Sequence, residues 1–171
     1  EDERTAAIRF AKHAKIDGAA RFHGIATYGH SIKLYWHKFQ DTLRVSALQR
    51  LLKAWTSLRE PSPAELYSQI DWLYDELDQA RAWLVPLFPS TCNVFKMYVQ
   101  AHHRALGELL QAQMPLEEVD AASLLELYHV AQEHETRLLK KKHGIDASWL
   151  EPSLLGGREQ NIMDDYTGLI T

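Results

Sequence analysis

The only cysteine of the 171-residue chain lies ahead of a tandem pair of histidines, in the stretch LVPLFPSTCNVFKMYVQAHH. A lone cysteine with a histidine base nearby is the arrangement of a nucleophilic cysteine site. Cys92 falls in the first turn of a predicted helix, a position where a helix dipole favours a thiolate. His102 and His103 follow it by 10 and 11 residues. That separation is roughly 15 Å along a helix, so neither histidine is its base. We therefore predict a structural elbow rather than a catalytic loop.

Three other histidines, His23, His30 and His37, recur at seven-residue spacing. This spacing places them on one face of a helix, but each step is about 10.5 Å, far longer than ligand bonds of roughly 2 Å to one metal ion allow. We interpret them as a half-exposed polar stripe, with a pH-sensitive contact as the alternative.

A third pattern, Glu126-x-x-His129, matches the motif of di-iron four-helix bundles. Such sites need two copies of the motif and a glutamate on each of two other helices, whereas this chain has one copy. His134 follows His129 by five residues, so the two side chains do not share a helical face. A separate segment, LLGGRE, lacks both the spacing and the lysine of a phosphate-binding loop. We predict no catalytic residue, no metal ligand and no cofactor-binding residue, and we expect the protein not to be an enzyme.

The elements that would position these residues all have helical periodicity. A long amphipathic helix is predicted from about residue 25 to 58, roughly 50 Å in length. The next helix begins with Ser62 as N-cap, Pro63 in its first turn and Glu65 completing a capping box. Its apolar stripe is Leu66, Ile70, Leu73, Leu77 and Leu84. Pro86 and Pro89 are expected to end it.

Three further helices follow the prolines. Ser90 or Thr91 is predicted to cap the third, and Asp120 to cap the fourth, which ends at Gly144 after the basic run KKKH. The fifth carries Ile162, Tyr166 and Leu169. No segment alternates with period two for the length of a strand, so the fold class is predicted to be all-α.

Composition and charge limit the classes of protein and of partner that fit this chain. Of the residues, 46% are hydrophobic and 25% are charged, a composition sufficient for one packed core. The single cysteine excludes an internal disulfide framework and fits a reducing compartment. Residues 1–60 carry 11 Lys+Arg against 6 Asp+Glu, and residues 61–171 carry 8 against 17. The basic residues are dispersed, so nucleic acid is not an expected partner. Either two solvated faces or a basic surface for acidic lipid or protein explains this asymmetry.

No apolar run reaches the length of a membrane span, and no signal-peptide pattern opens the chain. The chain begins at Glu1 and stops inside a helical pattern, so we expect a piece of a larger protein. Within it we expect a single helical region, 1–171, with a long basic helical segment at 1–60 and helices joined by Pro/Gly elbows at 61–171.

The order of the helices and elbows resembles the Sec-six subunit family, component three of the exocyst, a vesicle-tethering complex. The resemblance covers roughly residues 70–170. Its elements are the LYxxL run at Leu73–Leu77, the Pro86-x-x-Pro89 elbow, Tyr98-Val99 with His103-x-Ala105-Leu106, Leu150-Glu151-Pro152, and the helix of Tyr166.

This resemblance implies an elongated antiparallel helical bundle, part of a rod of stacked bundles, that docks secretory vesicles at the plasma membrane before SNARE-mediated fusion. It implies as partners the other exocyst subunits, plasma-membrane SNARE proteins and, indirectly, small GTPases. The implied localisation is cytoplasmic, with peripheral recruitment to the plasma membrane at sites of polarised secretion. The alternatives are another helical scaffold or adaptor and a metal-binding helical-bundle enzyme. Four tryptophans at the edges of the apolar stripes are candidates for either core packing or partner contact: Trp36, Trp55, Trp72 and Trp83.

Overall fold

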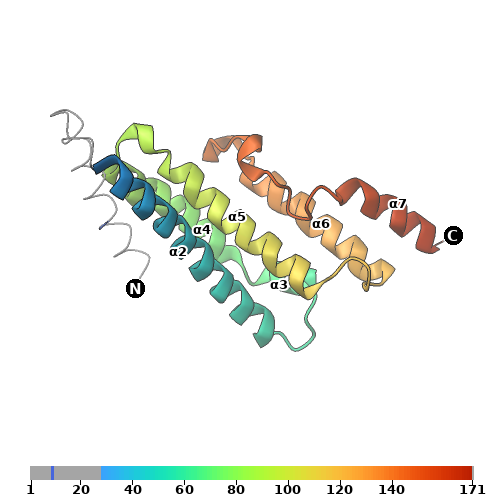
Figure 1. Ribbon diagram of the computed structural model, residues 1–171. Coiled ribbons are helices and arrows are strands. Elements are labelled where there is room, and N and C mark those ends of the chain that lie inside the picture. The colour runs from blue at the N-terminus through green and yellow to red at the C-terminus, as the bar shows by residue number, and fades with distance from the viewer. Residues whose placement is uncertain (1–8, 10–27, 171) are drawn as a thin grey trace.

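A computed structural model describes residue 9 and residues 28–170 of the chain, and every regular element in that part is helical (Figure 1). The predicted all-α fold is thereby confirmed. The longer helices are α2 (Tyr28–Ser57), α3 (Pro63–Ser68), α4 (Asp71–Gln79), α5 (Val94–Gln113), α6 (Ala121–Leu138) and α7 (Glu159–Ile170).

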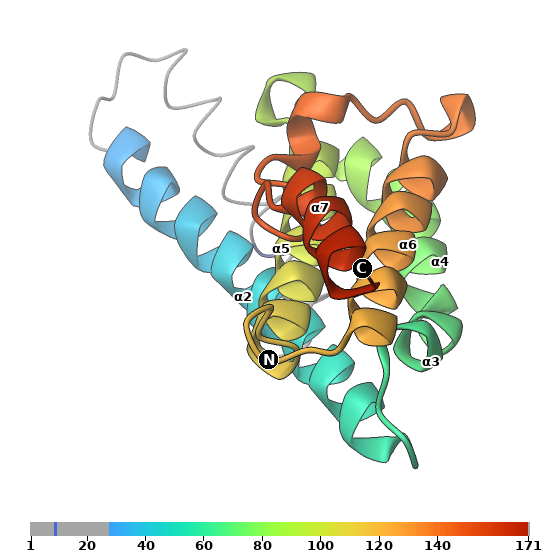
Figure 2. The ribbon, with the colours of Figure 1, turned by 90° about the vertical axis from the view of Figure 1, so that its right-hand side faces the viewer.

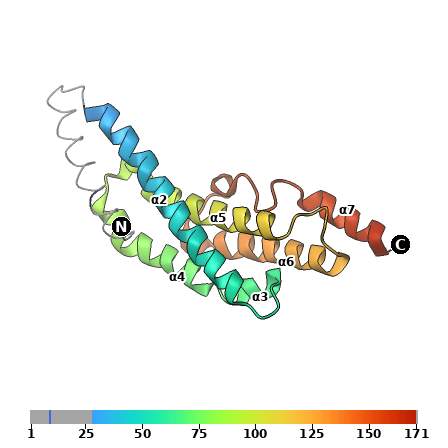
Figure 3. The same ribbon diagram turned by 60° about the horizontal axis from the view of Figure 1, so that its bottom comes forward.

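The core lies where α5 meets the other helices. α5 is buried along most of its length, with α2 packed across it and α4 and α6 alongside (Figures 1 and 3). One continuous cluster of buried side chains extends from Phe39 on α2 to Ile162 on α7. Every residue of the stripe predicted for the second helix, from Leu66 to Leu84, is buried.

That second helix is nevertheless not continuous, so its predicted extent is wrong. α3 ends at Ser68 and α4 begins at Asp71, because Gln69 N–H and Ile70 N–H bond to carbonyls three residues back, those of Leu66 and Tyr67. Such tight bonds close a helical turn early. The predicted start is confirmed, since Ser62 accepts a hydrogen bond from Glu65 N at 3.2 Å.

The elbow begins well before its prolines. A π-helical turn, Ala80–Leu84, and a 3-10 turn, Val85–Leu87, separate α4 from Pro89. Pro86 has no N–H for the carbonyl four residues back and its ring crowds that carbonyl. A π turn widens the backbone at this point, as the Val85 N–H to Ala80 O bond shows. The α-helix therefore ends at Gln79 instead of at the residue before Pro86.

The predicted cap of the third helix is also wrong. Ser90–Cys92 form their own 3-10 turn, and Asn93 takes the N-cap position with φ of 48°. Asparagine adopts this left-handed conformation more readily than most residues. Cys92 consequently lies before α5 and not in its first turn.

The C-terminal part folds back over α5. Asp120 caps α6 as predicted, accepting from Ser123 N at 2.8 Å. α6 ends at Leu138, earlier than predicted, and Lys141–His143 form a separate 3-10 turn closed by Gly144 at φ of 63°. This turn and the elbow lie at the same end of the bundle, opposite α3 (Figure 2). The following loop meets α5 closely, because a Cβ on Gly107 would lie 3.1 Å from Leu154 O.

Candidate functional site

The cysteine and the tandem histidines lie in different surroundings. Cys92 is half-buried in the elbow, while His102 and His103 lie buried on α5, where His102 contacts α4 and His103 contacts α6 and the C-terminal loop. Both ring nitrogens of His103 and Nδ1 of His102 are engaged with groups other than Cys92. The structure also shows what the sequence did not indicate: each histidine belongs to its own buried polar network.

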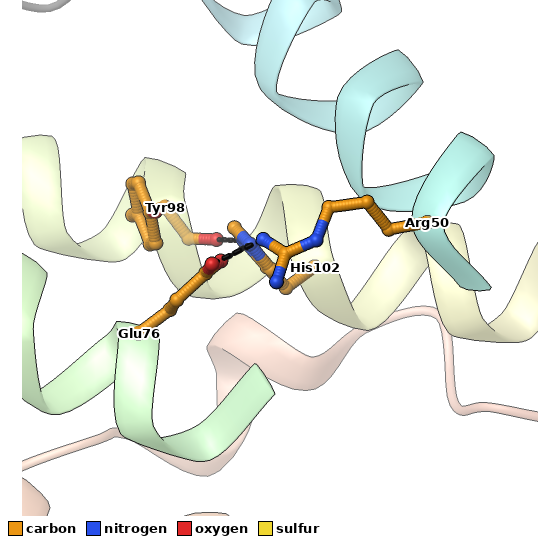
Figure 4. A network of polar contacts seen from close by, with 4 residues as sticks. All are labelled: Arg50, Glu76, Tyr98 and His102. Atoms are coloured by element: carbon orange, nitrogen blue, oxygen red, sulfur yellow. Dashed lines mark hydrogen bonds and ion pairs between the residues drawn. The ribbon is translucent and has the colours of Figure 1, made fainter. Parts of the chain in front are cut away.

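The first network joins three helices at one point (Figure 4). Glu76 of α4 contacts Arg50 of α2 through Oε1, and its Oε2 lies 3.5 Å from Nε2 of His102 on α5. His102 Nδ1 lies 2.9 Å from the carbonyl oxygen of Tyr98, one turn earlier, and the two rings stack with centroids 4.5 Å apart. The Arg50 guanidinium also lies over the Trp72 ring at 3.8 Å, a cation–π contact.

The Glu76 carboxylate is held ionised by this arrangement. Burial acts to raise its pKa, but the contacts with His102 and Arg50 outweigh burial and leave the pKa below its ordinary value. This half-buried carboxylate, in contact with two basic side chains, joins α4 to both α2 and α5.

The second network connects α4, α5, α6 and the C-terminal loop. Tyr74 Oη lies 2.7 Å from His134 Nδ1, and His134 Nε2 lies 3.2 Å from His103 Nδ1. His103 Nε2 in turn lies 2.9 Å from the carbonyl oxygen of Pro152. The two imidazole rings stack nearly parallel, 15° apart. The chain therefore contains a line of four polar groups drawn from four separate segments.

Only one neutral proton arrangement satisfies this whole line. Pro152 O can only accept, so His103 Nε2 donates and His103 Nδ1 accepts from His134 Nε2. His134 Nδ1 then accepts from the Tyr74 hydroxyl. The electrostatics agree, because burial lowers the pKa of His134 to about 3, and burial also lowers the pKa of His103.

The residues of the possible di-iron motif do not come together. Glu126 is half-buried beside Ala64 N, His129 is exposed, and His134 is turned inward and engaged with Tyr74. Among the residues that the structure describes, no group of three or more His, Cys, Asp or Glu side chains has metal-binding geometry. His37 is exposed, while His23 and the side chain of His30 lie outside the described residues.

The four candidate tryptophans differ in exposure. Trp55 is buried in the core, which contradicts a surface role for it, and Trp36 and Trp72 are half-buried against the core. Trp83, on the π turn, is 38% exposed. It is the candidate that remains accessible to a partner.

Some of the basic residues of the first segment form ion pairs with acidic residues of the second. Arg44 of α2 pairs with Glu108 of α5 at 2.8 Å, and Arg50 pairs with Glu76 of α4. These pairs join the basic first segment to the acidic second. Attraction between the segments accounts for some of the asymmetry without a basic binding surface.

These features define a helical scaffold, with buried polar ties between helices and an exposed tryptophan at an elbow. A family model described as Exocyst complex component Sec6 matches residues 1–171. The chain belongs to this family, as the resemblance over residues 70–170 predicted, and the family consists of scaffold subunits. Neither a curated protein nor a solved structure shows significant similarity to the chain. No helix in the described part combines the length and apolarity needed to cross a membrane.

Proposed function

We propose that this chain is a vesicle-tethering segment of the exocyst, a helical scaffold that helps dock secretory vesicles at the plasma membrane before SNARE-mediated fusion. It acts through protein–protein binding, with other exocyst subunits and plasma-membrane SNARE proteins as direct partners and small GTPases as indirect ones. Its place is the cytoplasmic side of the plasma membrane, at sites of polarised secretion, as one unit of a rod of stacked bundles.

The match of the whole chain to the exocyst component family carries this proposal. The two networks support it, since both tie helices together. Rigid ties of this kind suit a subunit whose activity is to hold a fixed surface.

Trp83 is the side chain that we propose for the contact. It projects from the elbow that joins α4 to α5, and it is 38% exposed. Exposed tryptophans bury a large area on binding and dominate the energies of many interfaces. The elbow backbone around it is fixed by Pro86 and Pro89, so little conformational entropy is lost when a partner binds.

The proposal is tested by measuring the binding of the chain to purified exocyst subunits, one at a time. We expect Trp83→Ala to weaken capture at least about tenfold if the tryptophan is an interface hot spot. Met163→Ala on α7 is the matched control, because Met163 is also apolar and 38% exposed but lies on another element.

The results distinguish the proposed Trp83 contact from the proposed tethering role. Capture that is equal for both variants and the parent chain excludes the Trp83 surface but leaves the tethering role standing. Separate titration with plasma-membrane SNARE proteins tests that class of partner. Circular dichroism of each variant establishes that a loss of capture is not a loss of folding.

A further inference from the structure

The lysine turn, residues 140–143, lies beyond the end of α6. The sequence predicts these residues at the end of a helix, where basic side chains balance the helix dipole. In the structure α6 ends at Leu138, and Arg137 is the basic residue of its last turn. The dipole acts within the last turn of a helix. It therefore does not account for the three consecutive lysines that follow.

Two contacts hold the lysine turn against the elbow. His143 is buried, and its Nδ1 lies 3.1 Å from Oδ1 of Asp78 near the end of α4. Arg81 of the π turn donates from Nη1 to the carbonyl oxygen of Lys142 at 2.5 Å. The three lysines, residues 140–142, are exposed, and they take part in no ion pair within the part of the chain that the structure describes. A fixed backbone therefore presents three adjacent charges to solvent.

Other basic residues of the acidic second segment collect at the same end of the bundle. Residues 61–171 carry 8 Lys+Arg against 17 Asp+Glu. Five of those eight basic residues lie on the π turn, in the first turn of α5 or in the lysine turn: Arg81, Lys96 and residues 140–142. Positive charge is thus concentrated at one place in a segment that is negative as a whole.

The acidic residues at this end are fewer. Asp78 pairs with His143, and Asp146 caps the next 3-10 turn. Asp75 and Glu133 lie about one helical turn behind the ends of α4 and α6. The two acidic residues at the end itself do not balance five basic ones.

The opposite end of α5 is acidic. Glu117, Glu118 and Asp120 are exposed in the connection from α5 to α6, away from the elbow (Figure 1). α5 has 20 residues, so roughly 30 Å separate the two ends. Charges in solvent are screened over about 10 Å at 0.1 M salt. A surface that touches the lysine turn is therefore attracted by it without repulsion from the acidic end.

We propose that the lysine turn binds directly to the surface of a membrane that contains anionic lipids. Each Lys or Arg close to such a surface strengthens binding by about fivefold. A lysine ammonium is a flexible point charge, which can pair with lipid head groups that have no fixed positions. Protein interfaces are depleted in lysine, so a membrane fits this surface better than an acidic protein does. This contact goes beyond the proposed function, which rests on binding to other proteins.

The test is co-sedimentation of the 171-residue chain with vesicles of phosphatidylcholine that contain about 30% phosphatidylserine. We expect binding to these vesicles, little binding to pure phosphatidylcholine vesicles, and loss of binding in about 1 M salt. The combined variant Lys140→Gln, Lys141→Gln and Lys142→Gln should bind about 100-fold more weakly, because three fivefold contributions are removed.

The matched control combines Lys38→Gln, Lys53→Gln and Arg59→Gln. These residues are also exposed, and their replacement changes the net charge equally but elsewhere in the chain. The control should keep the affinity of the parent chain for the vesicles. Circular dichroism establishes that both variants are folded.

Three results would overturn the membrane contact: a parent chain that does not bind the anionic vesicles, an equal loss of binding in the two triple variants, or release by inorganic phosphate at an ionic strength where sodium chloride has no effect. The last result would assign the lysines to a free phosphate ion instead. Capture of exocyst subunits by the lysine variant should be unchanged. Failure of the membrane contact is therefore distinguishable from failure of the proposed function.

Discussion

Lowering the pH from 7.5 to 5.0 should destabilise the chain through the buried line of Tyr74, His134, His103 and Pro152. In this line both imidazoles are neutral, and each of their nitrogens is already committed to a hydrogen bond. A proton added to either ring breaks the order of donors and acceptors and places a charge in the core. Unfolding releases the rings to water, where they accept the proton freely.

The magnitude follows from the pKa of His134. Its pKa is lowered to about 3 in the folded chain, against an ordinary value of 6.5, and its side chain is 1% exposed. The unfolded chain therefore binds more protons, so the stabilisation is complete above about pH 6.5 and is lost as the pH falls toward 3. Between pH 7.5 and 5.0 this single group removes about 2 kcal/mol of unfolding free energy. His103, whose pKa is also lowered, acts in the same direction.

Urea unfolding followed by circular dichroism at both pH values measures this loss. His134→Leu removes the titrating group, so the difference between pH 7.5 and 5.0 should shrink by about 2 kcal/mol in the variant, whatever its stability at pH 7.5. His129→Leu is the matched control on the same helix, because His129 is exposed. The control should keep the full pH dependence of the parent chain.

A parent chain whose stability is unchanged between pH 7.5 and 5.0 would contradict a neutral, buried His134. So would a pH dependence that is equal in the parent and His134→Leu. Either result would mean that His134 is protonated without penalty, and that the neutral arrangement of the line is wrong.

Four further outcomes are expected. Leu106→Ala, at a fully buried site on α5, should lower the unfolding free energy by about 2–5 kcal/mol in urea titration. Asp120→Ala removes the α6 cap and should cost about 1 kcal/mol, while Asp120→Asn, which keeps an acceptor, should retain most of the stability. Replacing Pro86 and Pro89 together with alanine should let the helix continue and loosen the elbow, and an unchanged melting temperature with an unchanged scattering profile would argue against their role. Elemental analysis after dialysis should give no stoichiometric zinc or iron.

Much of the fold could be predicted, because the residues on the buried face of a helix recur in the sequence at a fixed spacing. The stripe from Leu66 to Leu84 is buried throughout, although the backbone beneath it changes from α to π. Capping residues were equally informative where a side chain accepts the first free N–H groups, as at Ser62 and Asp120. The apolar stripe and the two caps could be predicted because each depends only on residues close together in the sequence.

Boundaries set by non-local packing were not predictable in the same way. The break between α3 and α4 has neither glycine nor proline, and Ile70 at the break is fully buried. Tertiary packing there overrides a continuous helical pattern. At the start of α5 a signal was present but missed, because Asn93 is well suited to the left-handed conformation that it adopts.

The buried networks could not be found from spacing alone. His134 and Tyr74 are 60 residues apart, and His103 and Pro152 are 49 apart. No periodicity relates residues at such separations. Nothing in the sequence indicates that His102 and His103 belong to two different networks.

We propose that this member of the exocyst component family works by binding other exocyst subunits. The most direct measurement is the affinity of the folded 171-residue chain for each purified exocyst subunit and for plasma-membrane SNARE proteins, by a solution titration. We expect saturable binding to at least one exocyst subunit, weakened by Trp83→Ala and unaffected by Met163→Ala. A chain that is folded by circular dichroism and binds none of these proteins would contradict it.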